Sequence, residues 1–481
     1  MIGGAGLQAD VRTFLWLAGV GILAYYLFIN GVYLVIHLAA IHRLRDELQR
    51  PDVETTNRSL GSPFLPGVAI LVPAFNEEAV IVETVQALLN LNYPATEIVV
   101  VNDGSGDQTL DRLHTEFDLQ VIDADPPFDI DGEAIRNVFR SARAGNLLVV
   151  DQQNRGKSAA LNTGLWLTDQ PLFCAIDADS LIDPDGLAKV LRPFIDRPAE
   201  TVAVGGTVQV ANGCAIEDGM VERTGLPASL LGRIQVMEYL RAFYSGRLGL
   251  AQLGSLVLIS GAFGVFRTEL IREIGGYNTD SITEDFDLVV RLHRHLLERD
   301  RDYRIDFVPE PVVWTQVPTT WVALGRQRRR WYRGLIGTLV AHRDIIGSRR
   351  YGRPATLGLP FKLFGEGLGR LMEGLGYVIL PIALLFQAVS VRFFLLYLFL
   401  TVGVGILLSW ISVFSEVWGY RRYDSPFDVL QLMGAAVLEN VGYRQWRTLV
   451  AWYALWEFLA GDNHWGDMVR SGFGQVDHDP N

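Results

Sequence analysis

Two Asp-Ala-Asp triplets occur in the chain, one in the segment FCAIDADS and one in the segment QVIDADPPFD. Two carboxylates at this spacing can hold a divalent cation beside a phosphate group. Asp177 and Asp179 follow an apolar run typical of a buried strand, whereas Asp123 and Asp125 precede two prolines and an acidic stretch typical of a loop. We therefore predict that the pair formed by Asp177 and Asp179 is functional and that the other pair is not.

Two further polar segments follow strand-like runs. In NDGSGDQT, Asp103 can accept a hydrogen bond from a nucleotide base or a ribose hydroxyl, or it can help to cap the turn into a helix. In NRGKSAALNTGL, Lys157 begins a helix, where the helix dipole and the ammonium group together favour a bound phosphate. The spacing of a Walker loop is missing, and no GxGxxG follows a strand, so a dinucleotide-binding fold has no support.

Carboxylates and basic residues also gather in two later segments. Glu284 and Asp285 open a helix in SITEDFDLVVRLHRH. Glu284 can form a capping box with Ser281, and a carboxylate here can also supply a general base. The segment RQRRRWYRG is the densest basic cluster and can be read as positive charge beside a membrane. Gln327 and Trp331, which share one helix face, instead suit a site that binds diphosphate and stacks on a sugar ring.

The elements that must position these residues alternate between strands and helices. Short runs rich in β-branched residues are followed by polar residues and then by helix-like segments. This alternation predicts a mainly parallel α/β sheet, in which ligands bind at the carboxyl ends of the strands. The predicted strands are 68–73, 97–103, 146–151, 172–177, 202–210 and 304–309.

The composition indicates a chain that is partly in a membrane. Of the 481 residues, 49% are hydrophobic, and the mean hydropathy is +0.20. The net charge of −12 argues against nucleic acid as a partner. The two cysteines, Cys174 and Cys214, have no metal-ligand spacing and exclude a disulfide framework, which fits a reducing cytosolic environment.

Three apolar segments are predicted to cross the membrane. Residues 13–40 contain no Asp, Glu, Lys or Arg and predict an anchor, not a cleaved signal peptide. The arginines at 43, 45 and 50 place the domain that follows in the cytoplasm. Segments 376–390 and 393–414 predict a hairpin of two spans, and 430–438 and 449–459 are spans or interfacial helices. Residues 247–266 are apolar but broken by glycines, and we expect them inside the domain or at its membrane face.

Seven segments in order resemble the motifs of membrane-embedded family 2 glycosyltransferases of the polysaccharide-synthase type: VPAFNEE, NDGS, GKSAALN, DAD, SGAFGVF, TED and QRRRW. Relatives of this type are the bacterial poly-N-acetylglucosamine, chitin, hyaluronan and cellulose synthases. The resemblance extends from Pro73 to Gly334, and the order of seven motifs makes it specific. No cyclic-dinucleotide-binding domain and no FxVTxK-like segment follows QRRRW, which disfavours a close relationship to the cellulose synthases.

The resemblance implies a GT-A-like, mainly parallel α/β sheet flanked by helices, with transmembrane helices at both ends. The implied parts are an N-terminal transmembrane anchor (1–50), a cytoplasmic glycosyltransferase domain (51–340), interfacial helices (341–375), a transmembrane hairpin (376–415), and membrane-associated or transmembrane segments with a cytoplasmic tail (416–481).

The resemblance also implies a role for each motif residue. Asp285 would be the general base, Asp179 would bind Mg²⁺ or Mn²⁺, and Asp103 would bind the uracil of a UDP-sugar. The other residues implied to bind the nucleotide-sugar are Pro73, Phe75, Glu77, Lys157, Asp177, Gln327 and Arg330. Those implied to bind the acceptor are Ser260, Gly261, Glu284 and Trp331.

The implied reaction is an inverting, metal-dependent transfer of a sugar from a UDP-sugar to a growing β-linked polysaccharide. The polysaccharide would be exported across the inner membrane, with membrane lipids and export proteins as partners. The alternative is a single transfer to a lipid carrier. A scaffold without activity predicts loss of the acidic and basic site residues, which are all present.

Overall fold

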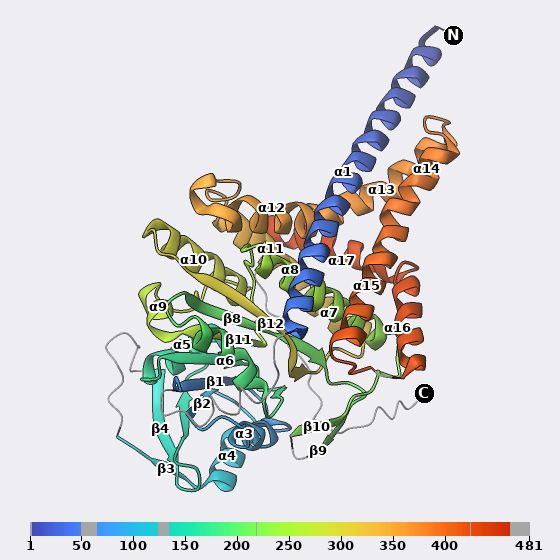
Figure 1. Ribbon diagram of the computed structural model, residues 1–481. Coiled ribbons are helices and arrows are strands. Elements are labelled where there is room, and N and C mark those ends of the chain that lie inside the picture. The colour runs from blue at the N-terminus through green and yellow to red at the C-terminus, as the bar shows by residue number, and fades with distance from the viewer. Residues whose placement is uncertain (1, 50–64, 124–133, 218, 424, 462–481) are drawn as a thin grey trace.

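The computed structural model describes residues 2–49, 65–123, 134–217, 219–423 and 425–461 (Figure 1). Asp125 and the segment 462–481 lie outside the described residues. The long helix α1 (Ile2–Leu48) and the C-terminal helices lie at one end of the molecule, and a large sheet lies at the other (Figure 1).

The sheet has ten strands in the order β3-β4-β5-β2-β1-β6-β11-β8-β12-β7. Seven strands run in one direction, and β4, β7 and β11 run against them. The strands are β1 (Val68–Ala74), β2 (Thr96–Asp103), β3 (Leu119–Val121), β4 (Ile135–Ser141), β5 (Leu147–Gln152), β6 (Leu172–Ile176), β7 (Ser180–Ile182), β8 (Thr201–Val210), β11 (Phe263–Arg267) and β12 (Arg304–Thr315). A separate hairpin is formed by β9 (Ala215–Glu217) and β10 (Met220–Arg223).

All six strands predicted from the sequence are present, and the prediction of a mainly parallel α/β sheet is confirmed. Five of them, β1, β2, β5, β6 and β8, are buried along nearly their whole length, as parallel strands covered by helices on both faces must be. The helices around the sheet are α3 (Ile81–Leu89), α4 (Thr109–Phe117), α5 (Lys157–Leu167), α6 (Gly186–Asp196), α9 (Thr268–Glu273) and α10 (Glu284–Glu298).

A second group of helices lies between the sheet and the long apolar helices. It consists of α7 (Leu230–Leu240), the π-helix η2 (Arg241–Arg247), α8 (Leu248–Gln252) and α11 (Trp321–Ala341). The apolar segment 247–266 is inside the domain, as expected, and ends in β11.

Three helical stretches are long and apolar enough to cross a membrane: Gln8–Leu48, Pro354–Leu385 and Val391–Gly419. Many large apolar side chains on them are exposed, as they would be against lipid. The stretches after α11 contain η3 (Arg349–Tyr351), η4 (Pro354–Gly358), α12 (Leu359–Phe361), η5 (Lys362–Gly367), α13 (Leu368–Leu385), α14 (Val391–Leu398), η6 (Phe399–Gly403), α15 (Val404–Gly419), α16 (Pro426–Leu438) and α17 (Tyr443–Ala460). The boundary predicted between 375 and 376 therefore falls within one continuous helical stretch.

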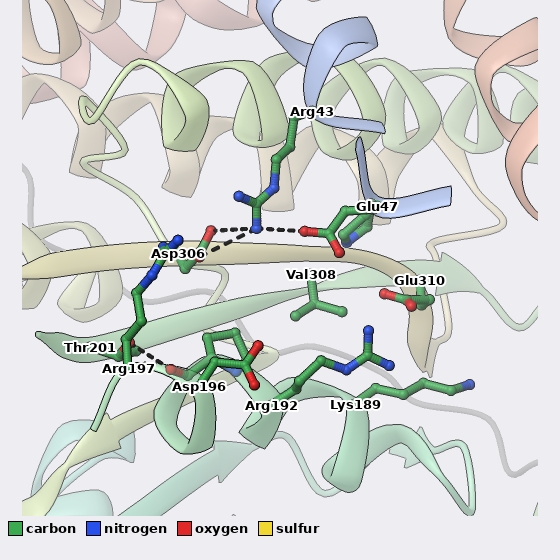
Figure 2. Close-up of a pocket in the computed structure, with 12 residues that line it drawn as sticks. Arg43, Glu47, Lys189, Arg192, Asp196, Arg197, Thr201, Asp306, Val308 and Glu310 are labelled. Carbon is green, nitrogen blue, oxygen red and sulfur yellow. Dashed lines mark hydrogen bonds and ion pairs between the residues drawn. The ribbon is translucent and has the colours of Figure 1, made fainter. Parts of the chain in front are cut away.

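The last turns of α1 belong to the core of the sheet domain. Ile36, Ala40 and Leu44 are almost completely buried in the same hydrophobic cluster as the central strands. Arg43 projects from α1 onto β12, where its Nη2 lies 3.3 Å from Asp306 Oδ1 and 2.6 Å from Glu47 Oε1 (Figure 2). These contacts tie α1 to the sheet.

The cavity beside these residues lies at the edge of the sheet where β8 and β12 begin. It is lined by α1, by basic residues of α6 such as Lys189 and Arg192, and by the first halves of β8 and β12 (Figure 2). Ligands of parallel sheets bind at the opposite edge, where the strands end.

Replacing Asp306 with asparagine is expected to destabilise the protein by about 3 kcal/mol, because it breaks a buried ion pair. Burial alone would raise the pKa of Asp306, but Arg43 and Arg304 hold it below its ordinary value. The stabilisation is therefore present above the unfolded pKa, roughly 3.9, and is lost as the pH falls through the lower folded value. A melting curve in detergent at neutral pH measures the effect, with the exposed Asp300→Asn as control. Equal melting temperatures for both variants would contradict it.

Candidate active site

The turns that follow β1 and β2 are joined by hydrogen bonds at the carboxyl edge of the sheet. The backbone N–H of Asn76 donates to Ser105 Oγ (3.0 Å), and Asn76 Oδ1 accepts from the N–H of Gly106 (2.8 Å). The N–H of Glu77 donates to Thr109 Oγ1 (2.8 Å). Asn76 has a φ of 55°, a left-handed conformation that asparagine tolerates.

The end of β1 and the turn after it carry three of the residues predicted to bind the nucleotide-sugar: Pro73, Phe75 and Glu77. Phe75 is 48% exposed at the tip of the turn, whereas Glu77 is buried beneath it. Pro73, at the end of β1, is partly exposed. The exposed ring of Phe75 offers a flat apolar face at the ligand edge, which suits stacking on a base.

Asp103, at the end of β2, accepts hydrogen bonds from the end of β5 and from the turn that precedes Lys157. The donors are Gln152 Nε2 (2.6 Å) and the backbone N–H groups of Arg155 (3.0 Å) and Gly156 (2.8 Å). Gly156 has a φ of 88°, which favours glycine. The observed contacts of Asp103 therefore fix the start of α5, and its contact with uracil stays a prediction.

Lys157 joins three separate motifs. Its Nζ lies 2.6 Å from Asp177 Oδ1, 3.2 Å from Glu284 Oε1 and 3.1 Å from the carbonyl oxygen of Gly261. Although burial lowers it, the two carboxylates raise the pKa of Lys157 above its ordinary value, so the ammonium is charged at neutral pH. These residues lie far apart in the sequence, and all of them contact the ammonium group of Lys157.

Asp285, the predicted base, is fixed by two backbone donors. The N–H of Gly261 donates to Oδ2 (2.7 Å), and that of Phe286 donates to Oδ1 (2.8 Å). Burial and the neighbouring Glu284 raise the pKa of Asp285 to about 6, although Lys157 opposes the shift. A Cβ on Gly261 would lie only 3.1 Å from Asp285 Oδ2, so the close approach favours glycine there. A carboxylate with this pKa is ionised at pH 7 and basic enough to accept a proton.

Asp177 and Asp179 end β6 on the same edge. Burial and the charge of Asp177 raise the pKa of Asp179 to about 7, with Lys157 and Arg330 acting in the opposite direction. A divalent cation would relieve the repulsion between the two carboxylates. No group of three or more His, Cys, Asp or Glu side chains suited to a metal occurs in the described part of the chain. The two carboxylates nevertheless fit Mg²⁺ or Mn²⁺ because Mg²⁺ commonly binds one or two carboxylates together with substrate phosphates.

Helix α11 carries the QRRRW residues and packs directly on the TED motif. A Cβ on Gly334 would lie 2.3 Å from Thr283 Cγ2, so only glycine permits this contact. Thr283 Oγ1 also lies 3.2 Å from Thr338 Oγ1. Arg330 is close enough to Asp179 to lower its pKa, and Trp331 is 37% exposed. Gln327, on the same helix, is partly buried.

The sequence analysis missed Glu238 of α7, which holds α11 in place. Its carboxylate, only 7% exposed, binds Arg328 Nη2 (2.7 Å), Tyr443 Oη (2.9 Å) and Arg447 of α17. Arg328 in turn lies over the ring of Trp331, 4.4 Å from its centroid. No local pattern marks Glu238, because its partners lie far along the chain.

Replacing Glu238 with glutamine is expected to lower transfer activity roughly 10–100-fold, because Arg328 and Trp331 lose their fixed position. The loss of a charge-assisted interaction is also expected to cost about 2 kcal/mol of stability. Initial rates and melting curves measure both effects. The control is the exposed Glu222→Gln, and a variant of Glu238 that matches it in both readouts would exclude the positioning role.

The structure thus brings most predicted site residues together. The Lys157 ammonium contacts Asp177, Glu284 and the carbonyl oxygen of Gly261, and the N–H of Gly261 donates to Asp285. Ser260 precedes Gly261 and accepts a backbone hydrogen bond from Phe263 at the start of β11. The β1 and β2 turns lie at the same edge of the sheet, and α11 packs both on Thr283 of the TED motif and on α17. The individual roles of these residues stay predictions.

Comparison with known proteins identifies relatives that match part of this chain. The poly-beta-1,6-N-acetyl-D-glucosamine synthase of Staphylococcus epidermidis is 28% identical over 271 residues, which cover 56% of this chain and 54% of the relative. The enzyme of the same name from Staphylococcus aureus is 27% identical over 336 residues, covering 69% and 68%. The chain thus spans about half the length of the first relative and two thirds of the second.

Among solved structures, the mannosyltransferase PcManGT from Pyrobaculum calidifontis, in complex with GDP-Man and Mn²⁺, has a TM-score of 0.47 at 18% identity. The match covers 86% of this chain and 99% of that one. A family described as "Glycosyltransferase like family 2" matches residues 66–334, which contain all seven motifs. Because this match covers more than half of the 481 residues, the chain belongs to glycosyltransferase family 2, as the sequence predicted.

Proposed function

We propose that the protein transfers N-acetylglucosamine from UDP-N-acetylglucosamine to the end of a growing β-1,6-linked polysaccharide. The names of the staphylococcal relatives support the sugar and the linkage. The observation that carries the proposal is the contact of Lys157 with both Asp177 and Glu284 beside Asp285. Through this contact, Lys157 links Asp177, which we expect to face the diphosphate, to Glu284, which we expect to face the acceptor.

The reaction is a single displacement. Asp285 accepts the proton of the acceptor hydroxyl as the hydroxyl oxygen bonds to the anomeric carbon of the donor. The bond between that carbon and the diphosphate oxygen breaks, and UDP leaves. Lys157 and Arg330 offset the negative charge that develops on the leaving group. Because the base and the diphosphate lie on opposite sides of the sugar, the configuration inverts.

Asp179, with Asp177, would hold Mg²⁺ or Mn²⁺ at the diphosphate. When bound, the ion would neutralise charge on the leaving group. On this proposal the raised pKa of Asp179, about 7, makes cation binding weaken as the pH falls below that value.

We further propose that the chain crosses the inner membrane three times, with the sheet domain in the cytoplasm. Arg43 at the end of α1 contacts β12, and Arg422, just after α15, contacts Asp183 at 3.0 Å. Both ends therefore lie on the side of the sheet domain, as an anchor and a hairpin require. The arginines after these helices fit a cytoplasmic location.

The same helices offer a polar interior for export of the product. Glu373 of α13 is buried and binds Arg370 and Arg444, each at 2.7 Å. Ionised residues inside membrane helices are costly and commonly line a path for polar substrates. We propose that the polysaccharide passes along this side of α13 and α17, surrounded by membrane lipids and assisted by export proteins.

The test uses full-length protein purified in detergent. It is incubated with UDP-N-acetylglucosamine, UDP-glucose or GDP-mannose and Mg²⁺ or Mn²⁺, and released nucleotide and product size are measured. We expect nucleotide release with UDP-N-acetylglucosamine, loss of release with a chelator, and a polymer cleaved by a β-1,6-specific glycosidase. A single added sugar would favour the alternative of one transfer to a lipid carrier. No release with any donor would contradict the proposed function.

A further inference from the structure

Asp287, two residues after the proposed base, is a buried carboxylate that belongs to none of the seven motifs. Arg291 Nε donates to its Oδ2 (2.7 Å), and His342 Nε2 donates to its Oδ1 (2.9 Å). Burial alone would raise the pKa of Asp287, but the hydrogen bond with His342 and the charge of Arg291 lower it below its ordinary value. The carboxylate is therefore ionised at neutral pH and binds both partners.

The contact with His342 fastens α10 to α11. His342 directly follows the last residue of α11 and is buried. Nearer the middle of α11, Gly334 and Thr338 lie against Thr283, just before α10 begins. Two separate contacts therefore set how α11, which carries the QRRRW residues, lies against the start of α10.

The contact with Arg291 leads to α5. Arg291 donates from Nη1 to the carbonyl oxygen of Ile274 (2.8 Å) and from Nη2 to that of Gly276 (2.6 Å). The next residue, Tyr277, is held by Asn162 of α5, which accepts from its N–H (2.7 Å) and donates to its carbonyl oxygen (2.8 Å). Gly276 has a φ of 73°, and a Cβ there would lie 2.4 Å from Asn162 Oδ1, so glycine is favoured in this turn.

The three helices joined in this way carry the residues of the proposed reaction. Helix α5 begins with Lys157, α10 has Asp285 in its first turn, and α11 carries Arg330. The two backbone hydrogen bonds of Asp285 orient its carboxylate but do not reach α11. Asp287 contacts the end of α11 directly and is connected to α5 through the guanidinium that it binds.

We propose that Asp287 is a positioning residue for sugar transfer: through Arg291 and His342 it holds the start of α10, and with it Asp285, in a fixed position between α5 and α11. The inference rests on the proposed function and adds to it a residue that touches neither donor nor acceptor. Displacement of a reacting group by about 1 Å can lower a rate roughly 10²-fold, so the effect on transfer is measurable.

The experiment compares full-length wild type with Asp287→Asn and His342→Gln, using UDP-N-acetylglucosamine as donor and a β-1,6-linked N-acetylglucosamine pentasaccharide as acceptor. The readouts are the rate of transfer, the KM for the donor, and the rate of UDP release by hydrolysis without acceptor. We expect both variants to lower transfer roughly 10–100-fold and to leave the donor KM within about twofold of wild type. Hydrolysis should fall much less, because a mobile water molecule tolerates a displaced base, so the ratio of hydrolysis to transfer rises.

The matched control is Glu298→Gln, which breaks another pair four residues apart in α10. Glu298 Oε1 lies 3.1 Å from Arg294 Nε, and both side chains are about one third exposed. Because exposed pairs contribute little, we expect all three readouts to stay within about twofold of wild type.

The ratio separates positioning from stability, since a smaller folded fraction lowers transfer and hydrolysis equally. A folded Asp287→Asn protein with the wild-type ratio would overturn the inference, while active wild type upholds the proposed function. If Asp287→Asn does not fold, the ratio for His342→Gln, which removes only one of the two partners, decides in the same way. Wild type that transfers from no donor would overturn the proposed function and the inference with it.

Discussion

Replacing Asp285 with asparagine is expected to lower the rate of sugar transfer roughly 10²–10⁴-fold, the usual contribution of a positioned general base. The amide cannot accept the proton of the acceptor hydroxyl. It also cannot accept from both Gly261 and Phe286, because its Nδ2 would face one of these N–H groups. The KM for the donor should change little, since the proposed function places the diphosphate on the other side of the sugar.

The pH profile of the wild type gives an independent test of the same residue. The base must be ionised, and its pKa is raised to about 6, so kcat/KM should fall as the pH drops below 6 and level off above it. If Asp179 must also be ionised, with its pKa of about 7, the fall begins nearer pH 7 and steepens below 6.

The control for Asp285→Asn is Asp280→Asn, five residues earlier and exposed. Melting curves of both variants separate loss of the base from loss of the fold. A folded Asp285→Asn protein with near-normal transfer would show that another group accepts the proton.

Replacing Lys157 with methionine is expected to lower transfer roughly 10²–10³-fold, as removal of a group that stabilises developing charge commonly does. Four carboxylates, those of Asp177, Asp179, Glu284 and Asp285, would then share the site without the ammonium. Because Lys157 lowers the pKa of both Asp179 and Asp285, the residual activity should shift to higher pH.

The matched control is Lys189→Met, which removes a lysine from the remote cavity lined by α6. Rates measured from pH 5 to 9 for both variants are the readout. A pH profile for the Lys157 variant that stays in place, or moves to lower pH, would show that the ammonium does not set the ionisation of the two aspartates.

The main strands could be predicted from the sequence because buried parallel strands are continuous β-branched runs that end in polar residues. The run of β2, for example, stops at Asp103. Strand β11 was hidden in an apolar segment, where periodicity cannot distinguish a strand from a buried helix. Strand β4 was missed because several of its side chains are exposed.

The site could be predicted where a motif carries several functional residues close together, as around Asp177 and Asp285. It could not be predicted where the role of a charged residue depends on partners that are far away in the sequence. Glu238 meets Arg328 and Arg447, which lie 90 and 209 residues further along the chain.

The burial of Ile36, Ala40 and Leu44 in the sheet core constrains how the protein is made. The helix that carries them precedes the sheet domain in the chain, whereas β12, against which Arg43 is paired, is completed only at Thr315. On the proposed topology, the sheet domain therefore finishes folding against a helix that has already been synthesised, at the membrane surface. A fragment released without α1 would expose part of its own core and become a target for aggregation and degradation.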